Sequence, residues 1–509
     1  MPAMAPFPEI GQTVARGRNW QRVEVDSQGW QQLAIVAAEG GARLGGLWAE
    51  KESVHLALVD GESGRMLVGT HACAEGRFPS VAALHAPAIR PERAIADLYG
   101  LLADGAPDTR PWLDHGRWDV RHPLGDATAA SGAAAAYVFR GAEGPPMHQI
   151  PVGPVHAGII EPGHFRFTAS GECVVRLEER LGYVHKGIDG LLVGANLEQA
   201  APIAARVSGD STVAYAVAFA QAVEEALGIE VPEPAVLTRG IAAELERIAN
   251  HLGDFGAISN DAAFSMLHAH CGVLRERTLR AAAGAFGHRL MMDLVVPGGV
   301  RRLPDRAGQG AIRELIALIA RDLPPLAGLY DASASLQDRT VATGRLDAAL
   351  ARAWSAGGYV GRASGLSFDA RKTPGYAPYD RLEFSVALRT TGDVDARVRV
   401  RIAEIETSLA LVDQMLDALE ESEGEATAGD LANLSTVEGG EGMALVEGFR
   451  GDVLAHVRIG PDRRIAACHL RDPSVFQWPL LEAAIEGNIV ADFPLVNKSF
   501  NCSYSGHDM

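Results

Sequence analysis

The chain has 509 residues, of which 47% are hydrophobic and 22% are charged, and its formal net charge is -18. A single hydrophobic core stops growing at roughly 250 to 300 residues, so this length predicts two or more domains of ordinary globular composition. No block of Lys and Arg stands out against the negative charge. The sequence therefore excludes a protein that grips nucleic acid phosphates.

The most apolar stretches are too short to cross a bilayer. The run 213–223 ends at Glu224 and Glu225, whereas a spanning helix needs about 20 apolar residues. We expect no transmembrane helix in this chain. The N-terminal segment has no basic stretch followed by an apolar core, which predicts a cytoplasmic protein without a secretory signal.

The five cysteines form neither a disulfide framework nor a Cys-x-x-Cys pair. Buried free thiols are the expected state of four of them, and Cys502 is considered below. No cysteine spacing supports an iron-sulfur cluster in this chain, and no dinucleotide-binding fingerprint is present.

A Gly-, Ala- and Pro-rich run at 126–148 predicts a linker between two domains. Upstream, residues 1–125 are predicted to form a small α+β domain. Downstream, residues 149–509 have long helical periods, which predicts a mainly α domain. The predicted strands of the first domain are the short apolar runs 30–39, 43–50 and 53–60.

The clearest helix begins near Thr238. One of its faces is apolar, with Ile241, Leu245, Ile248 and Leu252 at spacings of four, three and four. Further helices are predicted at 262–288, 309–320 and 394–419.

Charged residues also follow the helical period in this region. Glu244, Arg247 and His251 share a second face of the first helix, and we expect Glu244 and Arg247 to form an ordinary surface or interface ion pair. The Glu- and Gly-rich stretch 421–442 is predicted to be a mobile surface loop.

The N-terminal region carries the segments DLYG, PDTRPWL and HPL in that order within residues 78–124. This order resembles the small docking subunit that complex I and group 4 hydrogenases place beside their large subunit. The resemblance implies a docking scaffold without a cofactor. His115 and His122 have no partner at ligand spacing, so we expect them to be structural rather than metal ligands.

From residue 150 onward the chain contains the blocks IPVGPVHAGIIEPGHFRF, ERLGYVHKGIDGLL, RGIAAELERIANHLGDF, GRASGLSFDARKTPGYAPYD and GDVDARVRVRIAEI. In this order they resemble the signature segments of the large subunit shared by [NiFe]-hydrogenases and complex I. The fusion of two domains in one chain is most similar to group 4 hydrogenases of the formate hydrogenlyase type.

In such hydrogenases, two Cys-x-x-Cys pairs hold nickel and iron through soft thiolates. By this resemblance the first pair falls at Ser208 and Ser211, and the second falls at Cys502 and Ser505. A serine hydroxyl stays protonated at neutral pH and is a hard, weak donor. With three of the four thiolates missing, we expect no [NiFe] centre and no cofactor bound by this chain.

Other positions match functional segments of the family. Glu161, in Glu-Pro-Gly-His, matches the segment with the proton-transfer glutamate of hydrogenases, a role that suits a partly buried carboxyl of raised pKa; the alternative is a structural carboxylate. His156 and His164 resemble the histidines that line the quinone pocket of complex I, and Asp261 resembles the aspartate behind one of them. Such a pair can hydrogen-bond a quinone carbonyl and deliver a proton; the alternative is an internal polar pair.

Two features bear on these roles. The tyrosine that complex I uses for the second quinone carbonyl is replaced by Gly209, with Tyr215 as a candidate substitute or a packing residue. Arg450 matches the arginine that approaches the iron ligands of hydrogenases. Without the metals we expect Arg450, and Arg206 with it, to pair with carboxylates.

Three hypotheses follow. The first is a redox subunit that takes electrons from an iron-sulfur small subunit and reduces an acceptor, with a quinone as one candidate. The second is a non-catalytic adaptor that couples an electron-transfer arm to antiporter-like, ion-pumping membrane subunits. The third, which the serines disfavour most, is an active hydrogenase. The resemblance implies a cytoplasmic chain held peripherally on the inner face of the cell membrane.

Overall fold

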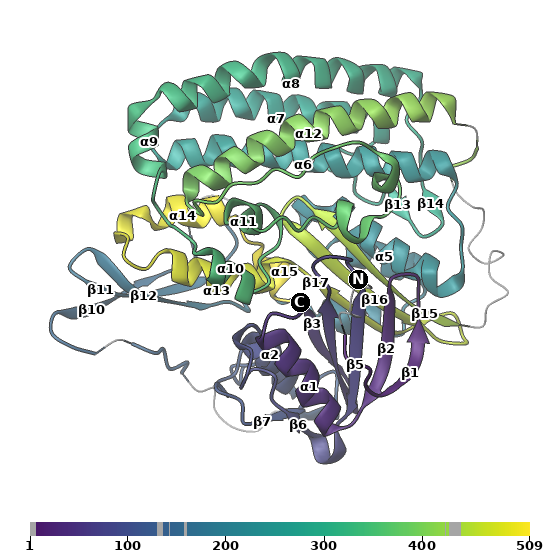
Figure 1. Ribbon diagram of the computed structural model, residues 1–509, viewed down its shortest axis with the longest axis vertical. Helices are drawn as coiled ribbons and strands as arrows, with labels where there is room; N and C mark the ends of the chain where they lie inside the picture. Colours follow the sequence, from purple (N-terminus) through teal and green to yellow (C-terminus); the bar gives the residue numbers. More distant parts are fainter. Residues whose placement is uncertain (1–6, 130–135, 142, 157–159, 423, 427–438) are drawn as a thin grey trace, which may run out of the picture.

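The computed structural model describes residues 7–129, 136–141, 143–156, 160–422, 424–426 and 439–509. The molecule has mixed α/β content, with a sheet region at the N-terminus and a largely helical part after it (Figure 1). No helix in these ranges is both long and apolar enough to traverse a lipid bilayer.

A five-stranded sheet organises the N-terminal region. Its order is β1-β2-β5-β4-β3, and all pairs are antiparallel except β2 with β5. The strands are β1 (Gln12–Arg16), β2 (Trp20–Val25), β3 (Arg43–Glu50), β4 (Ser53–Val59) and β5 (Met66–Ala72). The predicted strands at 43–50 and 53–60 are therefore confirmed as β3 and β4.

The predicted strand at 30–39 is wrong, because this segment belongs to helix α1 (Ser27–Ala38). The carboxylate of Asp26 accepts a hydrogen bond from the backbone N–H of Gly29, which caps the first turn. Its buried residues have helical spacing, which outweighs the β propensity of the apolar run. They are Trp30, Leu33, Ala34 and Ala37.

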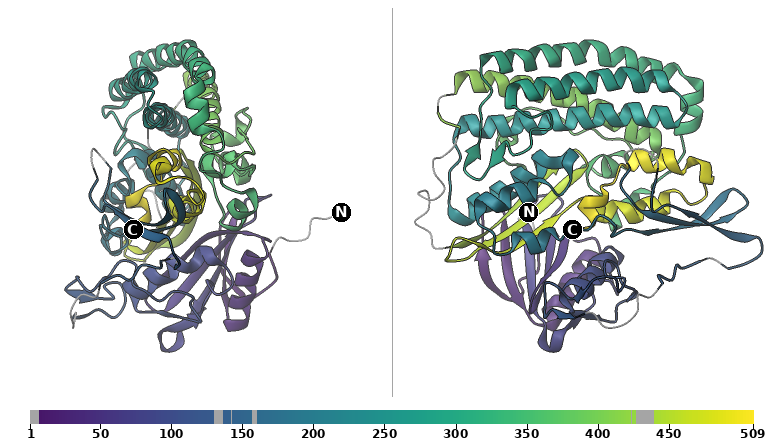
Figure 2. Two further views of the ribbon diagram at one scale, coloured as in Figure 1. Left: turned by 90° about the vertical axis from the view of Figure 1, so that its left-hand side faces the viewer. Right: turned by 180° about the vertical axis from the view of Figure 1, so that it is seen from behind.

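Four long helices form a layer on one side of the molecule (Figures 1 and 2). Helix α6 packs against α7 and α12, and α8 packs against α7 and α12. Their bounds are α6 (Glu233–Asp261), α7 (Ser265–Phe286), α8 (Arg306–Ala332) and α12 (Val394–Glu421). All four predicted helices are present, and α8 runs a dozen residues past its predicted end, through Pro324 and Pro325.

A three-stranded antiparallel sheet lies between this helical layer and the N-terminal sheet (Figure 1). It consists of β15 (Gly440–Gly448), β16 (Gly451–Ile459) and β17 (Ile465–Arg471), and α5 (Thr212–Leu227) packs on β15 and β16. A second antiparallel sheet projects from the side of the molecule. It is formed by β10 (Met147–Val152), β11 (His164–Ser170) and β12 (Cys173–Arg180).

Shorter elements connect these layers. They are α2 (Ile89–Tyr99), α3 (Ile188–Leu192), α4 (Leu197–Ala205), α9 (Ala334–Thr340), α10 (Ala348–Ala353), α11 (Gly358–Ala363), α13 (Ser474–Ala484), α14 (Phe493–Phe500), α15 (Tyr504–His507), β6 (Arg77–Pro79), β7 (Leu102–Asp104), β8 (Val120–Arg121), β9 (Thr128–Ala129), β13 (Val295–Val296) and β14 (Gly299–Val300). The predicted mobile loop at 421–442 falls largely outside the described residues, as does part of the predicted linker at 126–148.

One hydrophobic cluster joins the N-terminal sheet to the central sheet. Trp20 and Trp48, from the first, pack with Met443, Leu445 and Leu454 from the second. Burial of these side chains removes apolar surface from water on both sides of the junction. The two regions therefore share part of one core.

We expect Leu454→Ala to lower the free energy of unfolding by about 2 to 5 kcal/mol, because Leu454 is fully buried at this junction and truncation leaves a cavity. Chemical denaturation followed by tryptophan fluorescence measures the change. Leu388→Ala is the matched control, since Leu388 is 39% exposed. Equal effects of the two substitutions would contradict a shared core at Leu454.

Candidate functional site

The first predicted ligand pair lies in the short segment between α4 and α5. The hydroxyl of Ser208 donates to Oδ1 of Asp210 at 2.9 Å, and its Oγ lies 3.1 Å from Oγ of Ser503. The hydroxyl of Ser211 accepts a hydrogen bond from Nη1 of Arg450 at 3.1 Å. Both serines of the pair are buried and engaged with neighbouring side chains.

The C-terminal segment meets Ser208 through Ser503. The hydroxyl oxygen of Ser503 also accepts from the backbone N–H of Gly506 at 2.9 Å, which caps α15, and lies 3.5 Å from Oγ of Ser505. Cys502 is buried beside it, and burial raises the pKa of its thiol well above the ordinary value. Among the described residues, Ser208 makes no hydrogen bond to Cys502 or Ser505, the two predicted positions. Ser503 was missed by the sequence reasoning, although Ser503 and Gly506 have the same spacing as Cys502 and Ser505.

Arg450 closes the site from the turn between β15 and β16. Its two Nη atoms each lie 2.7 Å from an oxygen of Asp210, and its Nε donates to the carbonyl of Asn501 at 2.6 Å. Burial alone would raise the pKa of Asp210, but Arg450 and the Ser208 hydroxyl lower it to about 2. The predicted carboxylate pairing of Arg450 is confirmed. That of Arg206 is confirmed too, with Asp293 at 2.6 Å on the surface.

Glu161 lies at the edge of this site. Its Oε2 accepts a hydrogen bond from the backbone N–H of Ser505 at 3.2 Å, and its charge acts on Lys186. The Lys186 ammonium donates to the carbonyls of Arg206 and Val207, next to Ser208. Glu161 itself is exposed, so the expectation of a partly buried carboxyl is wrong for this chain. The β10–β11 connection holds it at the surface rather than against the core.

The structure brings His156 and His164 together but not Asp261. His156 Nε2 lies 2.8 Å from the carbonyl of Gly163, and His164 Nδ1 lies 3.2 Å from the carbonyl of Gly153. Burial lowers the pKa of His164. Asp261, at the end of α6, faces the charges of Lys498 and His268. Within the described ranges it makes no hydrogen bond to either predicted histidine partner.

Tyr215 is fully buried in α5, and its hydroxyl donates to Oδ2 of Asp472 at 2.5 Å. It therefore packs inside the fold and has its donor occupied. His115 and His122 are bound to backbone carbonyls, those of Trp112 and Asp97 respectively. Over the part of the chain that the structure describes, no group of three or more His, Cys, Asp or Glu side chains is arranged to hold a metal ion.

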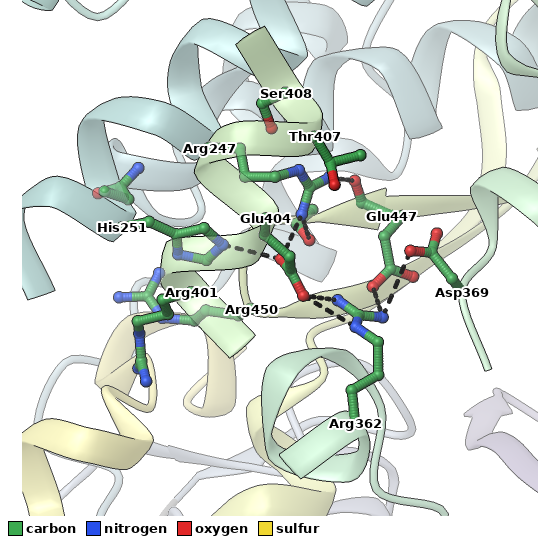
Figure 3. A network of polar contacts seen from close by, with 12 residues as sticks. Arg247, His251, Arg362, Asp369, Arg401, Glu404, Thr407, Ser408, Glu447 and Arg450 are labelled. Atoms are coloured by element: carbon green, nitrogen blue, oxygen red, sulfur yellow. Dashed lines mark hydrogen bonds and ion pairs between the residues drawn. The ribbon is translucent and has the colours of Figure 1, made fainter. Parts of the chain in front are cut away.

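A buried network of charges lies next to this site (Figure 3). The guanidinium of Arg362, on α11, donates to Glu404 of α12 at 2.9 Å and to Glu447 of β15 at 2.8 Å. His251 Nε2 lies 2.8 Å from the second oxygen of Glu404, and Arg247 lies 3.7 Å from it. These five side chains join three helices to the central sheet.

The same network corrects the prediction for Glu244 and Arg247. They do form an ion pair, at 3.2 Å, but both are essentially inaccessible to solvent rather than at a surface. The carboxylate of Glu244 also accepts from Ser408 and Tyr379 at 2.6 and 2.7 Å. Arg371 contacts Glu244 at 3.2 Å. These hydrogen bonds and ion pairs, from elements distant in sequence, offset the free-energy cost of burying the two charges.

A signal for this network was present in the sequence of α12. Four polar residues of this helix recur at spacings of four, three and four, which is the spacing of a helix face that packs against the core. The helix also has an apolar face. All four are buried: Arg397, Arg401, Glu404 and Ser408.

Comparison with known proteins agrees with this architecture. Residues 262–509 match the family model for the respiratory-chain NADH dehydrogenase 49 Kd subunit, and residues 36–133 match that for the 30 Kd subunit. Formate hydrogenlyase subunit 5 of Escherichia coli (strain K12) is 30% identical over 85% of this chain and 77% of that protein. The carbon monoxide-induced hydrogenase of Rhodospirillum rubrum is 31% identical over 70% of this chain and 97% of that protein.

A solved structure of the membrane-bound sulfane sulfur reductase, described as an archaeal respiratory membrane complex, contains a similar chain. The TM-score is 0.67 at 26% identity, over 71% of this chain and 98% of that one. The family models and these relatives support a redox-type large subunit. The chain belongs to the family that includes complex I 49 Kd subunits and the large subunits of membrane-bound hydrogenases.

We expect Glu404→Gln to destabilise the chain by about 3 to 5 kcal/mol, because it removes one partner of a buried charge network. Arg362 and His251 hold the pKa of Glu404 well below its ordinary value, although burial acts to raise it. The stabilisation by Glu404 is thus complete above a pH of about 4.3 and is lost as the pH falls below that value. Denaturation curves from neutral to acidic pH measure both effects.

The control for this variant is Asp413→Asn on the same helix, where the side chain is 58% exposed and paired with Arg313. It is expected to change stability by less than about 1 kcal/mol. A similar loss in both variants would contradict the role given to the buried network.

A cysteine cross-link tests the contact between Ser208 and Ser503. With their Oγ atoms 3.1 Å apart, the double variant Ser208→Cys with Ser503→Cys is expected to form a disulfide under mild oxidation, seen as a mobility shift and a loss of titratable thiols. Ser208→Cys alone, which keeps the native Cys502, is the control. A disulfide in that control instead would place Cys502 opposite residue 208.

Proposed function

We propose that this chain is the redox-type large subunit of a membrane-associated complex, receives electrons from an iron-sulfur partner subunit, and works without a [NiFe] centre. The observation that carries the proposal is the bonded set formed by Ser208, Ser503, Asp210 and Arg450. Ser208 of that set is one of the positions at which the family resemblance implies a thiolate ligand, and its hydroxyl is bonded to Asp210 and Ser503 instead.

The donor chemistry of these residues does not suit nickel or iron. A hydroxyl binds such metals weakly, and both serines already share their hydrogen bonds with neighbours. The thiol of Cys502 is buried with a strongly raised pKa, which disfavours the thiolate that a metal would require. The ion pair of Arg450 with Asp210 neutralises the charge in the space between the two segments.

The proposed acceptor is a quinone or a similar small carbonyl compound. His156 and His164, whose charges lie near enough to interact, and the exposed Glu161 are the groups we assign to the acceptor and its protons. Without Asp261, His156 is oriented by the carbonyl of Gly163. His164 is oriented by the carbonyl of Gly153 and by Arg166, whose Nε donates to its Nε2 at 3.3 Å. A neutral imidazole has one N–H donor, so a quinone carbonyl would replace a backbone carbonyl as the partner of that N–H.

The relatives support the proposed setting. Their names describe membrane-bound hydrogenases and NADH-quinone oxidoreductase subunits, and the solved structure is an archaeal respiratory membrane complex. By this analogy we propose that the chain sits peripherally on the inner face of the cell membrane. Its proposed partners are an iron-sulfur small subunit and antiporter-like membrane subunits.

A second candidate function is a non-catalytic adaptor between an electron-transfer arm and ion-pumping subunits. It is favoured by the same bonded set, because the polar groups of the site pair with one another instead of facing an open space. A catalytic cavity is expected to keep its polar groups free for substrate.

The experiment uses the intact complex, purified from cells that express the chain with its partners. We expect nickel far below one atom per chain by elemental analysis. We also expect electron transfer from the reduced iron-sulfur partner to a water-soluble quinone analogue to fall by about two orders of magnitude in His164→Ala and Glu161→Gln. His270→Ala and Glu62→Gln, both exposed and distant in sequence, are the controls.

One nickel per chain would overturn the proposal that the metal site is lost. Full electron transfer in both His164→Ala and Glu161→Gln would overturn the assignment of the redox site. In that case the adaptor function remains.

A further inference from the structure

A cavity of about 100 Å³ lies at the junction between the N-terminal region and the large-subunit region. Its walls come from α2 and β3 on one side and from β17 and the C-terminal segment on the other. They are largely apolar and aromatic, with Trp48, Trp112 and Phe476 among them. The cavity is separate from the serine site described above.

Three protonatable groups meet at this cavity: Tyr99 of α2, Asp189 of α3 and Cys468 of β17. The charge of Asp189 acts on both of the others, so the three groups lie near one another. Within the described ranges, none of the three side chains has a hydrogen-bond partner, and Oδ1 of Asp189 is buried without one. A buried polar atom left unpaired costs about 1 to 3 kcal/mol.

The basic groups in the wall are already engaged. Arg90 pairs with Glu179 and Glu482 at 3.2 and 3.0 Å, and Arg471 pairs with Asp452. Asp189 thus has no cation as a partner in the described part of the chain. The titratable and charged groups that line the cavity with it are Arg90, Tyr99, Cys468, His469, Arg471 and His507.

Water is the occupant that fits this space. One buried water needs roughly 10 to 15 Å³ and two to four polar partners, so a cavity of this size has room for several waters. Tyr99 also borders a second, larger cavity of about 540 Å³, whose walls include the exposed residues Lys51, Glu52 and Asp126. Tyr99 therefore stands between the inner cavity and the solvent side.

We propose that the junction cavity is a hydrated proton-exchange site, in which Asp189 binds and releases a proton and Tyr99 connects the cavity water to the outer cavity. On release, the O–H bond of the Asp189 carboxyl breaks and the proton joins the neighbouring water. On uptake, the same water returns a proton to the carboxylate. No electron changes place, and solvent supplies and receives the proton.

The ionisation of Asp189 supports this role. Burial raises its pKa to about 7, so the carboxyl exchanges its proton near neutral pH rather than near the ordinary value of about 3.9. Because the folded state holds the extra proton, its contribution to stability is present at low pH and is lost as the pH rises towards 7. This site does not depend on the electron acceptor proposed above.

Infrared spectroscopy of the full chain tests the proposal without an activity assay. Other buried carboxyls, such as Glu92 and Glu447, also have pKa values raised to about 7, so the spectrum of Asp189→Asn is subtracted from that of the wild type. In the difference we expect a carboxylic acid C=O band that is present at acidic pH and lost at alkaline pH, with a midpoint near neutrality. The band should shift on transfer to D2O. Tyr99→Phe is expected to slow that shift severalfold, because it removes the protonatable group of the residue that borders both cavities.

Two substitutions fill the cavity. Ala94→Leu adds volume from α2, with Ala96→Leu on the same helix as the control that lines neither cavity. Gly46→Ala is the milder second variant, since its new Cβ would come no closer than 3.4 Å to any neighbour. Both filling variants should slow the shift in D2O severalfold, and the control should leave it unchanged.

An unaltered band in Asp189→Asn would overturn the assignment of the proton to Asp189. Exchange as fast as in the wild type in both Ala94→Leu and Gly46→Ala would overturn the route through the cavity. Neither result bears on nickel content or on quinone reduction, so failure of this inference is distinguishable from failure of the proposed function.

Discussion

The geometry of the candidate site depends on one constraint, which is that every charge buried between the helical layer and the central sheet must have a partner. Arg362 bridges Glu404 and Glu447, and so ties α11 and α12 to β15 at distances of 2.8 to 2.9 Å. A buried charge without such a partner costs several kcal/mol, so sliding of the helices against the sheet is penalised steeply. The turn that carries Arg450 follows directly after β15 and is positioned by the same sheet.

The hydroxyl groups of Ser208 and Ser503 join two segments that are distant in sequence. Thiolates would repel one another without a metal, whereas Ser208 and Ser503 can share a hydrogen bond at 3.1 Å. The space between the segments is spanned by Arg450 and Asp210. The two segments thereby form a bonded contact that holds the C-terminal segment against the start of α5.

The junction of the two regions forms a shared packed surface and a cavity, in addition to holding the regions together. Trp48 stacks on His469 with ring centroids 4.7 Å apart and also packs near Leu454, so aromatic and aliphatic contacts from both sheets form one surface. The cavity with Asp189 lies against this surface and takes residues from both regions. Because the two regions belong to one chain, each is present at a high effective concentration relative to the other. Their packing therefore avoids the loss of translational and rotational entropy that association of separate chains would require.

The sequence by itself determined the elements whose patterns are local. The apolar period of α6, the run that became α12, and the strands β3 and β4 all follow from side-chain alternation within a few turns or residues. The family resemblance and the carboxylate pairing of Arg450 were also accessible. Asp26, which caps α1, was a local signal for the start of a helix. The apolar run after it led to the prediction of a strand instead.

Only the tertiary structure decided which distant residues meet. The meeting of Ser208 with Ser503 rather than Cys502 joins residues 295 positions apart, a distance that no local pattern spans. The burial of Glu244 and Arg247 depends on partners more than a hundred residues away, such as Arg371 and Ser408. Helical spacing fixes which side chains share a face, but the packing of other elements decides whether that face meets water or protein.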